Sequence, residues 1–505
     1  KMKAGEIQPR EFRIADMLAS TVTDKSEFAC KACENFCAIQ NLTINGRKYP
    51  FGGQCSRWEN ARNKKTFDAA EFDLVARRNR MMFHEFGVPP DSGAALKAGK
   101  PVIGLAAVFS VYSYYPLYSW FFKELGYAVE LSEAVDHAGV RMCQSNRCYP
   151  YEIAHGTFFD LVRKGVRDIF VPHVVSMPRD EGAMASLSCP IAQAAPYYLV
   201  STFGDAGARI LRPVIDMSEG LDTIEKAFVD LGVQLGRSVA TAGDAFRKGV
   251  ERQRAFERAL KEEGRKVLER IEKENRIGIV LVGRPYNAFA KVANMGVPVK
   301  FASRGIHIIP YEFLPYEEEP ARYSMYWKFG QSILRSLAYV KKNPRLFPVF
   351  ISNFGCGPDS FIQHFAYFLL DRKPMLYLEL DSHTADAGIG TRAAAFLDIV
   401  SGYSKLGETA RVVPPRNPAE FLVMDKKGYV RTSAGELLPM THPRVTFVFP
   451  SMGRFNTEAG AAAASTIGMR GVAMPPVDDR VLAIGKSFTS GKECSPTVFT
   501  VGSLM

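Results

Sequence analysis

From Pro101 onward, short apolar runs alternate with stretches of helical periodicity, and this alternation constrains the fold more than any other feature of the chain. The first block predicts strands at 102–109, 127–131 and 168–175, with helices at 114–125 and 151–164. Strands separated by helices pair in parallel, because each crossover returns the chain to the same edge of the sheet. We therefore expect a parallel sheet covered by helices.

A second block repeats the pattern after a long, proline-free segment at 221–275 that predicts one or two long helices. Its predicted strands are 277–282, 307–311, 347–352 and 374–379, and its predicted helices are 292–304, 323–342 and 360–370. The repetition predicts the α/β class, with tandem doubly wound domains of the flavodoxin or Rossmann kind. An N-terminal cysteine-rich metal module precedes them.

A chain of 505 residues is too long for one core, so several domains are expected. The predicted division is a four-cysteine metal module at 1–65, a linker helix at 66–98, a first α/β domain at 99–220, a long helical connector at 221–276, a second α/β domain at 277–405, an irregular connector at 406–444, and the incomplete start of a third α/β unit at 445–505.

The composition excludes some functions and leaves others open. No run of 18 apolar residues occurs, and Lys1-Met2-Lys3 is followed by polar residues instead of an apolar leader, so we expect a cytoplasmic protein with no membrane association. The net charge is +11, but the basic residues are scattered, so we expect solvated surface and no nucleic-acid partner. A start at Lys1 and a cysteine motif near the end suggest a segment of a larger chain.

Nine cysteines in a cytoplasmic chain favour metal or redox use over disulfides. Cys30, Cys33 and Cys37 fall on one short loop, and Cys55 follows a Gly-Gly turn. Four thiolates at this spacing fit one tetrahedral zinc or one iron-sulfur cubane. Spacing does not separate the two metals, and four unrelated buried cysteines are the alternative.

A second set consists of Cys148, Cys189 and Cys356, each on a loop with a proline one or two residues later. Cys148 and Cys356 stand at predicted strand-to-helix junctions, the edge where open α/β sheets bind ligands. Backbone amides and helix N-termini stabilise thiolates and an anionic inorganic core. We expect these loops to hold a cluster between the two domains; three separate buried thiols are the alternative.

Two further side chains are candidate catalytic residues. His155 follows Cys148 by seven residues on the predicted helix, from which an imidazole could donate a proton or bind a sulfide. Arg284 leaves a predicted strand at the same sheet edge and could clamp an anionic ligand. A histidine satisfied within its helix and a loop-fixing arginine are the alternatives.

The cysteine loops resemble the 2-hydroxyacyl-CoA dehydratase family, and most closely the large activase-associated and double-cubane-cluster relatives of its subunits. The segments that carry the resemblance include Cys148-Tyr-Pro-Tyr-Glu-Ile-Ala-His155, Val282-Gly-Arg-Pro-Tyr-Asn287, Asn353-Phe-Gly-Cys-Gly-Pro-Asp-Ser360 and Phe488-Thr-Ser-Gly-Lys-Glu-Cys494-Ser-Pro496. It extends over most of residues 25–505.

The resemblance implies an oxygen-sensitive iron-sulfur cluster, either 4Fe-4S or a double cubane, on Cys148, Cys189 and Cys356. It implies that Cys494 belongs to a second set, whose remaining ligands include Cys143 or lie beyond Met505. It also implies low-potential electrons from an ATP-dependent activase, which must be a separate protein or domain because this chain has no Walker-type loop. An acyl-CoA or another small molecule would be the substrate, and a dimer or a larger chain the assembly.

The leading hypothesis is thus an iron-sulfur reductase or electron-transfer component. It accepts electrons from the activase and passes them to a substrate or a second cluster. The alternative is a non-catalytic scaffold or assembly protein whose four-cysteine module holds structural zinc.

Overall fold

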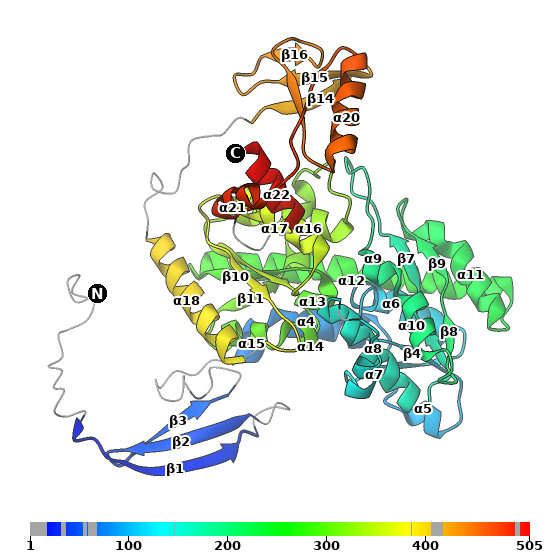
Figure 1. Ribbon diagram of the computed structural model, residues 1–505. Coiled ribbons are helices and arrows are strands. Elements are labelled where there is room, and N and C mark those ends of the chain that lie inside the picture. The colour runs from blue at the N-terminus through cyan, green and yellow to red at the C-terminus, as the bar shows by residue number, and fades with distance from the viewer. Residues whose placement is uncertain are drawn as a thin grey trace. The chain divides into compact units, whose positions relative to one another are not determined.

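The computed structural model describes residues 18–31, 37–53, 58, 68–145, 147–384, 386–405, 418–489 and 495–505. They form a mixed α/β structure with several parallel sheets and many helices (Figure 1). The chain divides into two compact units. The first comprises Lys1–Gly355 and Pro374–Ser404, and the second comprises Cys356–Lys373 and Lys405–Met505.

The first unit contains two four-stranded sheets in which all strands are parallel. One has the order β5-β4-β6-β8, formed by β4 (Val102–Leu105), β5 (Ala128–Leu131), β6 (Asp168–Phe170) and β8 (Arg209–Leu211). The other has the order β11-β10-β12-β13, formed by β10 (Gly278–Val282), β11 (His307–Pro310), β12 (Leu346–Ser352) and β13 (Leu376–Glu379). In both, the first strand along the chain lies between the second and the third.

The strands form where the sequence offers continuous apolar runs, as parallel strands buried on both faces require. Every residue of β4, β10 and β12 is buried. The helices that accompany the sheets in the first unit are α3 (Ala69–Phe72), α4 (Leu74–Arg80), η1 (Met81–Phe86), α5 (Ala94–Lys97), α6 (Val111–Glu124), α7 (His137–Arg141), α8 (Tyr149–Arg163), α9 (Pro190–Gln193), α10 (Ala195–Phe203), η2 (Leu221–Ile224), α11 (Glu225–Gln234), α13 (Pro285–Ala288), α14 (Lys291–Asn294), α15 (Val297–Ala302), η3 (Tyr311–Phe313), η4 (Tyr316–Glu318), α16 (Lys328–Lys342) and α18 (Asp386–Ser404).

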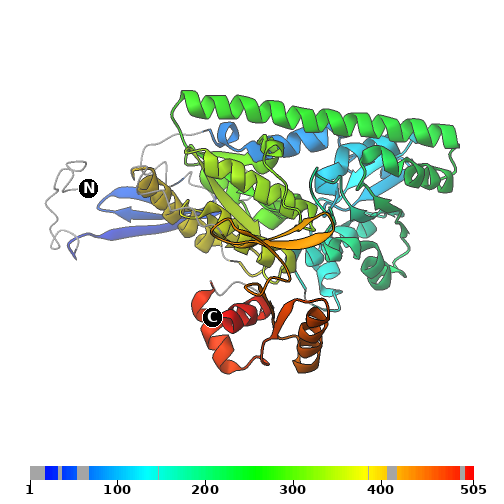
Figure 2. The same ribbon diagram turned by 90° about the horizontal axis from the view of Figure 1, so that it is seen from above.

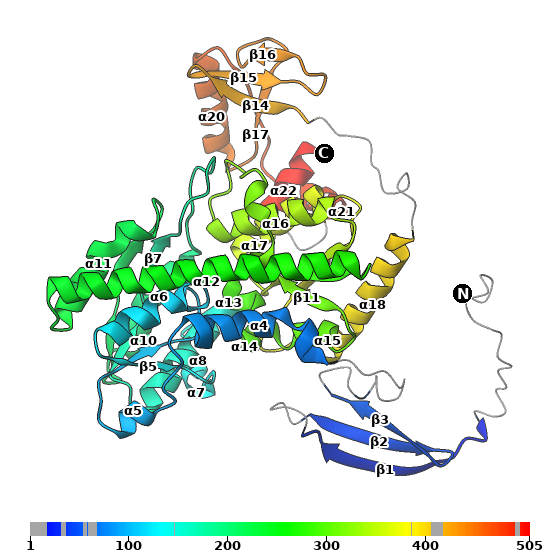
Figure 3. The same cartoon turned by 180° about the vertical axis from the view of Figure 1, so that it is seen from behind.

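Helix α12 (Val239–Lys273) is the longest element, with 35 residues in one uninterrupted helix (Figure 2). Ser238 caps it by accepting a hydrogen bond from the Thr241 amide at 3.1 Å. It packs against α6 beside the first sheet and against η3 beside the second (Figure 3). Its outer face is covered by ion pairs three or four residues apart, such as Arg265 with Glu262 and Glu269.

Gly264 allows α12 to reach η3, and its replacement by alanine should destabilise the protein. A methyl group there would lie 1.9 Å from the carbonyl oxygen of Phe313, which is backbone and cannot rotate away. We expect the free energy of unfolding to fall by about 1 to 3 kcal/mol, the usual cost of overpacking. Urea or thermal unfolding of Gly264→Ala would measure it.

Gly243→Ala on the same helix is the matched control. Its methyl group would meet only the flexible ends of Arg247 and Glu225, at 3.3 and 3.4 Å. Alanine also has the higher helix propensity, so this variant should be as stable as the parent or more stable. Equal stability of the two variants would contradict the close approach of α12 and η3.

The first unit also contains an antiparallel sheet near the N-terminus, formed by β1 (Val22–Ala29), β2 (Ala38–Ile44) and β3 (Arg47–Gly52). Asn45 and Gly46, both with positive φ, make the two-residue turn between β2 and β3. The amide of Cys30 donates to the carbonyl oxygen of Cys37 at 2.8 Å and so closes the loop between β1 and β2.

Several predicted elements of the first unit differ from those observed. The strand predicted at 168–175 is two strands: β6 pairs with β8, whereas β7 (His173–Ser176) pairs with β9 (Val214–Asp216) in a separate sheet. The helix predicted at 292–304 is interrupted at Met295 and Gly296, which have left-handed φ values of 50° and 75°. The helix predicted at 323–342 begins only at Lys328, and the strand predicted at 102–109 ends at Leu105.

The second unit contains helix α17 (Gly357–Leu370) and small sheets and helices toward the C-terminus. Its antiparallel sheet consists of β14 (Glu420–Met424), β15 (Lys427–Arg431) and β16 (Leu437–Pro439), in a region that the sequence predicted to be irregular. The remaining elements are β17 (Thr446–Phe449), α20 (Arg454–Thr466), β18 (Arg470–Ala473), α21 (Asp479–Phe488) and α22 (Ser495–Leu504), with β17 and β18 parallel. Within the described ranges of both units, no helix is long and apolar enough to cross a membrane.

Candidate functional site

Cys148, Cys189 and Cys356 share one local structure: each is the N-cap residue of a helix with proline in its first turn. Cys148 begins α8, Cys189 begins α9 and Cys356 begins α17. The proline restricts the backbone where the helix starts, which is why the motifs fold this way locally. The sulfur of Cys356 accepts a hydrogen bond from the amide of Asp359 at 3.4 Å, as a capping side chain does.

Cys148 and Cys189 are buried, each 8% exposed, and both belong to the first unit. Their loops meet around Tyr198 of α10. Burial first, and then the negative charges that Cys148, Tyr151, Cys189 and Cys143 can carry, raise the pKa of Tyr198 well above its ordinary value. The phenol therefore stays neutral, and Cys143, Cys148 and Cys189 all lie near enough to influence its ionisation.

The ring of Tyr198 is held by two aromatic neighbours from α8. It packs on Tyr151 with ring centroids 4.6 Å apart, and it stacks on His155 at 5.2 Å with an angle of 9° between the rings. The Nδ1 atom of His155 donates to the carbonyl oxygen of Tyr151 at 2.8 Å, and Thr202 Oγ1 lies 3.4 Å from Nε2. Burial lowers the pKa of His155, so this fully buried imidazole is neutral and positions Tyr198.

Arg284 lies where the chain leaves β10, at the carboxyl edge of the second sheet. Its guanidinium is buried and donates to the hydroxyl of Tyr286 at 3.1 Å and to Oδ1 of Asn353 at 3.5 Å. Asn353 in turn donates to the carbonyl oxygen of Leu380 at 3.2 Å. These bonds join the loops after β10, β12 and β13, where a doubly wound sheet binds its ligands.

The loop that leads to Cys356 approaches the loop of Cys148. Gly355, the last residue of this part of the first unit, has a φ of 73°, and a methyl group on it would lie 3.2 Å from the carbonyl oxygen of Arg147. Arg147 immediately precedes Cys148, and Gly355 immediately precedes Cys356. A residue other than glycine at 355 would be strained and would crowd this approach.

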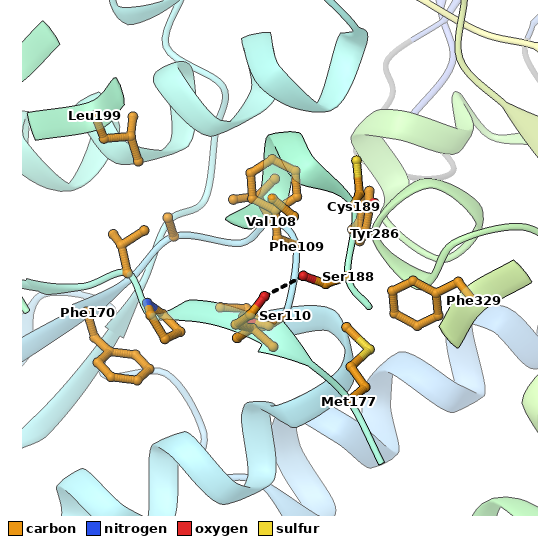
Figure 4. Close-up of a pocket in the computed structure, with 16 residues that line it drawn as sticks. Val108, Phe109, Ser110, Phe170, Met177, Ser188, Cys189, Leu199, Tyr286 and Phe329 are labelled. Atoms are coloured by element: carbon orange, nitrogen blue, oxygen red, sulfur yellow. Dashed lines mark hydrogen bonds between the residues drawn. The ribbon is translucent and has the colours of Figure 1, made fainter. Parts of the chain in front are cut away.

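A small cavity of about 30 Å³ lies beside Cys189 (Figure 4). Its walls come from the loops after β4 and β6, where the strand order of the first sheet reverses. Tyr286 of α13 and Phe329 of α16 complete the lining. Ser188, next to Cys189, donates its hydroxyl to the carbonyl oxygen of Val174. The walls are mostly apolar, and the cavity holds no more than about two water molecules.

A roomier cavity of about 710 Å³ lies at the carboxyl ends of β4 and β5 in the first unit. Ala107 and Ser132 line it from the first sheet, and Val292, Asn294 and Gly296 line it from the loop region before α15. The hydroxyl of Tyr149, the residue after Cys148, donates to the carbonyl oxygen of Val292 at 3.4 Å. This volume is large enough for a small organic ligand.

Within the described ranges, no group of three His, Cys, Asp or Glu side chains is arranged to hold a single metal ion. A cubane is bound through separate iron atoms, so its thiolate ligands lie farther apart than the ligands of one ion. Cys33, Cys55 and Cys494 lie outside the described residues. The four-cysteine module at Cys30, Cys33, Cys37 and Cys55, and the ligand set that would include Cys494, therefore remain predictions.

Two residues at this site were not singled out as functional by the sequence. Tyr198 comes from α10, with no motif around it, and only its place in the fold reveals its neighbours. Cys143 was noted only as a partner for Cys494, although it precedes Cys148 by five residues. Burial, followed by the charge of Glu152, raises the pKa of Cys143 to about 11.

Comparison with known proteins gives one informative match. Residues 102–314 match the family model described as the CoA enzyme activase uncharacterised domain (DUF2229). The match includes Cys143, Cys148, Cys189, Tyr198 and Arg284. It links this segment to CoA enzyme activase-related proteins, which agrees at that coarse level with the resemblance to activase-associated dehydratase relatives.

The other comparisons add little. No curated protein matches the chain. Among solved structures, the chain is similar to the C-terminal domain of glucosamine-fructose-6-phosphate aminotransferase from Francisella tularensis, with 11% identity over 66% of this chain and 95% of that chain. The TM-score of 0.18 is too low to support any argument about fold or function.

Proposed function

We propose that this protein is an iron-sulfur reductase or electron-transfer component of the 2-hydroxyacyl-CoA dehydratase type. It accepts low-potential electrons from an ATP-driven activase and passes them to a substrate or a second cluster. The observation that carries the proposal is that Cys148 and Cys189 are both helix N-caps in segments that meet at the buried ring of Tyr198, which packs on Tyr151 of α8. Both cysteines lie within the segment that matches the activase-related domain.

The residues present suit a cluster by their chemistry. Thiolates are the usual ligands of iron-sulfur clusters, and Cys148, Cys189 and Cys356 are the proposed set. The buried hydroxyl of Tyr198 has no hydrogen-bond partner among the described residues, and so retains a donor for an added acceptor. A bound cluster would supply one-electron chemistry at low potential.

The surrounding side chains have supporting roles in this proposal. His155, neutral and fixed to Tyr151, orients the ring of Tyr198. Arg284 fixes the loop that precedes Cys356 through Asn353 and brings positive charge to an anionic centre. The cavity of about 710 Å³ is the proposed place for an acyl-CoA portion or another small substrate, because the cavity at Cys189 is too small.

The N-terminal cysteines are a second, separate proposal within this function. The hydrogen bond from the Cys30 amide to the Cys37 carbonyl closes the loop that carries the first three cysteines. Gly52, at the end of β3, pairs with Ile39 near the start of β2, and Cys55 follows three residues later. We therefore propose that zinc or a second 4Fe-4S cluster binds Cys30, Cys33, Cys37 and Cys55.

Metal and sulfide analysis of the full chain, purified without oxygen, tests the proposed function. We expect iron and acid-labile sulfide in about equal amounts, and an electron paramagnetic resonance signal after chemical reduction. An activase with ATP should produce the same signal. Zinc without iron or sulfide would overturn the proposal and favour the scaffold alternative.

A further inference from the structure

The hydroxyl of Tyr198 is a buried polar group without a hydrogen-bond partner among the described residues. Such a group costs about 1 to 3 kcal/mol relative to one that is paired, so its presence calls for a reason. The neighbouring Tyr151 is different, because its hydroxyl interacts with the side chains of Arg147 and Ser145. Of these two neighbouring tyrosines, only Tyr198 has a buried hydroxyl without a partner among the described residues.

The ring of Tyr198 cannot easily turn its hydroxyl toward another acceptor. Tyr151 and His155 pack against it, and the Nδ1 bond of His155 to the Tyr151 carbonyl fixes both neighbours on one turn of α8. The backbone amide of Tyr198 donates to the carbonyl of Ala194 at 3.1 Å, in the segment that continues from Cys189. The position of the hydroxyl is therefore set by α8, which begins at Cys148, and by α10, which follows directly after the α9 helix that begins at Cys189.

The hydroxyl belongs to a ring held between the segments that begin at two of the proposed ligands. Tyr198 lies on α10, which follows the short helix α9 that begins at Cys189, and its ring packs on Tyr151 and His155 of α8, the helix that begins at Cys148. A protonated phenol can donate, whereas a thiolate or an inorganic sulfide can only accept. The geometry thus offers one donor to a group of acceptors that carry negative charge once a cluster is bound.

We propose that Tyr198 is a positioning residue that donates a hydrogen bond from its hydroxyl to a sulfur atom of the cluster bound at Cys148 and Cys189, and thereby raises the reduction potential of that cluster. A hydrogen bond to sulfur stabilises the more negative, reduced state more than the oxidised state. Because this role rests on the proposed function, its test must separate the loss of the cluster from the loss of the bond.

Tyr198→Phe removes the hydroxyl and keeps the ring. Anaerobic redox titration of the full chain, followed by electron paramagnetic resonance, should show unchanged iron and sulfide content and a midpoint potential shifted to more negative values. Tyr197→Phe is the matched control: its neighbouring hydroxyl bonds to His173 at 2.8 Å, and its side chain is exposed. The control should leave the potential unchanged.

A second variant keeps the test decisive if Tyr198→Phe binds the cluster poorly. Incorporation of 3,5-difluorotyrosine at position 198 gives a stronger donor of nearly the same shape, and should shift the potential in the positive direction. Equal potentials for parent, Tyr198→Phe and the fluorinated protein, at full iron content, would overturn this inference alone. Absence of iron and sulfide from the parent protein would instead overturn the proposed function, and this role with it.

Discussion

Cys189→Ala is expected to remove most of the iron and sulfide bound by the second cysteine set, and with them the signal of the reduced cluster. The side chain is 8% exposed and stands at the N-cap of α9, so in the proposed ligand set it supplies one of three thiolates. Iron and sulfide analysis of the anaerobically purified variant, with thermal unfolding to verify its fold, would measure the loss. The alanine removes only one sulfur, so the fold should persist.

Cys143→Ala is the matched comparison for this prediction. Cys143 also lies near Tyr198, but it follows α7 and does not cap a helix. The proposed ligand set therefore predicts that Cys143→Ala retains the iron that Cys189→Ala loses. Equal losses in both variants would show that the ligand set has been assigned incorrectly, and retention of iron in Cys189→Ala would refute the site.

Arg78→Met should lower the free energy of unfolding by about 3 to 5 kcal/mol, the usual cost of breaking a buried ion pair. Arg78 is fully buried in α4 and contacts both α6, beside the first sheet, and η3, beside the second. Its Nε atom lies 2.9 Å from Glu312, and its Nη2 atom donates to the carbonyl oxygen of Tyr112 at 2.6 Å. Methionine fills similar space but leaves the carboxylate of Glu312 without this partner. Urea unfolding would give the value.

Arg77→Met, one residue earlier, is the matched control. It shows whether the loss of unfolding free energy comes from the buried ion pair of Arg78 or from any change of arginine to methionine in α4. Arg77 pairs with Glu85 and Glu263, but its side chain is 30% exposed. Such pairs contribute about 0 to 1 kcal/mol, so this variant should unfold near the parent midpoint. A loss in Arg77→Met as large as that in Arg78→Met would contradict the special role of the buried arginine.

The sequence predicted the parallel sheets of the first unit well, because buried strands such as β10 and β12 are continuous apolar runs. It could not predict that the strand at 168–175 changes partners after Phe170, because that change depends on where β8 and β9 lie. It did not predict β14 and β15, because the prolines at 414, 415 and 418 are typical of irregular structure. The Asn45-Gly46 pair is a local signal for the hairpin between β2 and β3.

For the site, the position of the cysteines in the chain predicted where helices begin, but the sequence did not predict which side chains surround them. Cys148 and Cys356 were expected at strand-to-helix junctions, and both do begin helices. Cys356 follows strand β12 as expected, whereas Cys148 follows helix α7, so the predicted junction is wrong there. The tandem relation of the two α/β blocks and the ligand roles remain predictions. Tyr198 could not be found, because its contacts with Tyr151 and His155 exist only once α8 and α10 pack together.

The length of α12 has a consequence for the electron transfer that we propose. A helix of 35 residues spans about 50 Å, and this one packs without a break against α6 beside the first sheet and η3 beside the second. Such a helix limits how far α6 and η3 can shift relative to each other. A rigid, preformed polar environment needs little rearrangement when the charge changes. The stiffness of α12 would thus keep the reorganisation energy of the site small, and electron exchange fast.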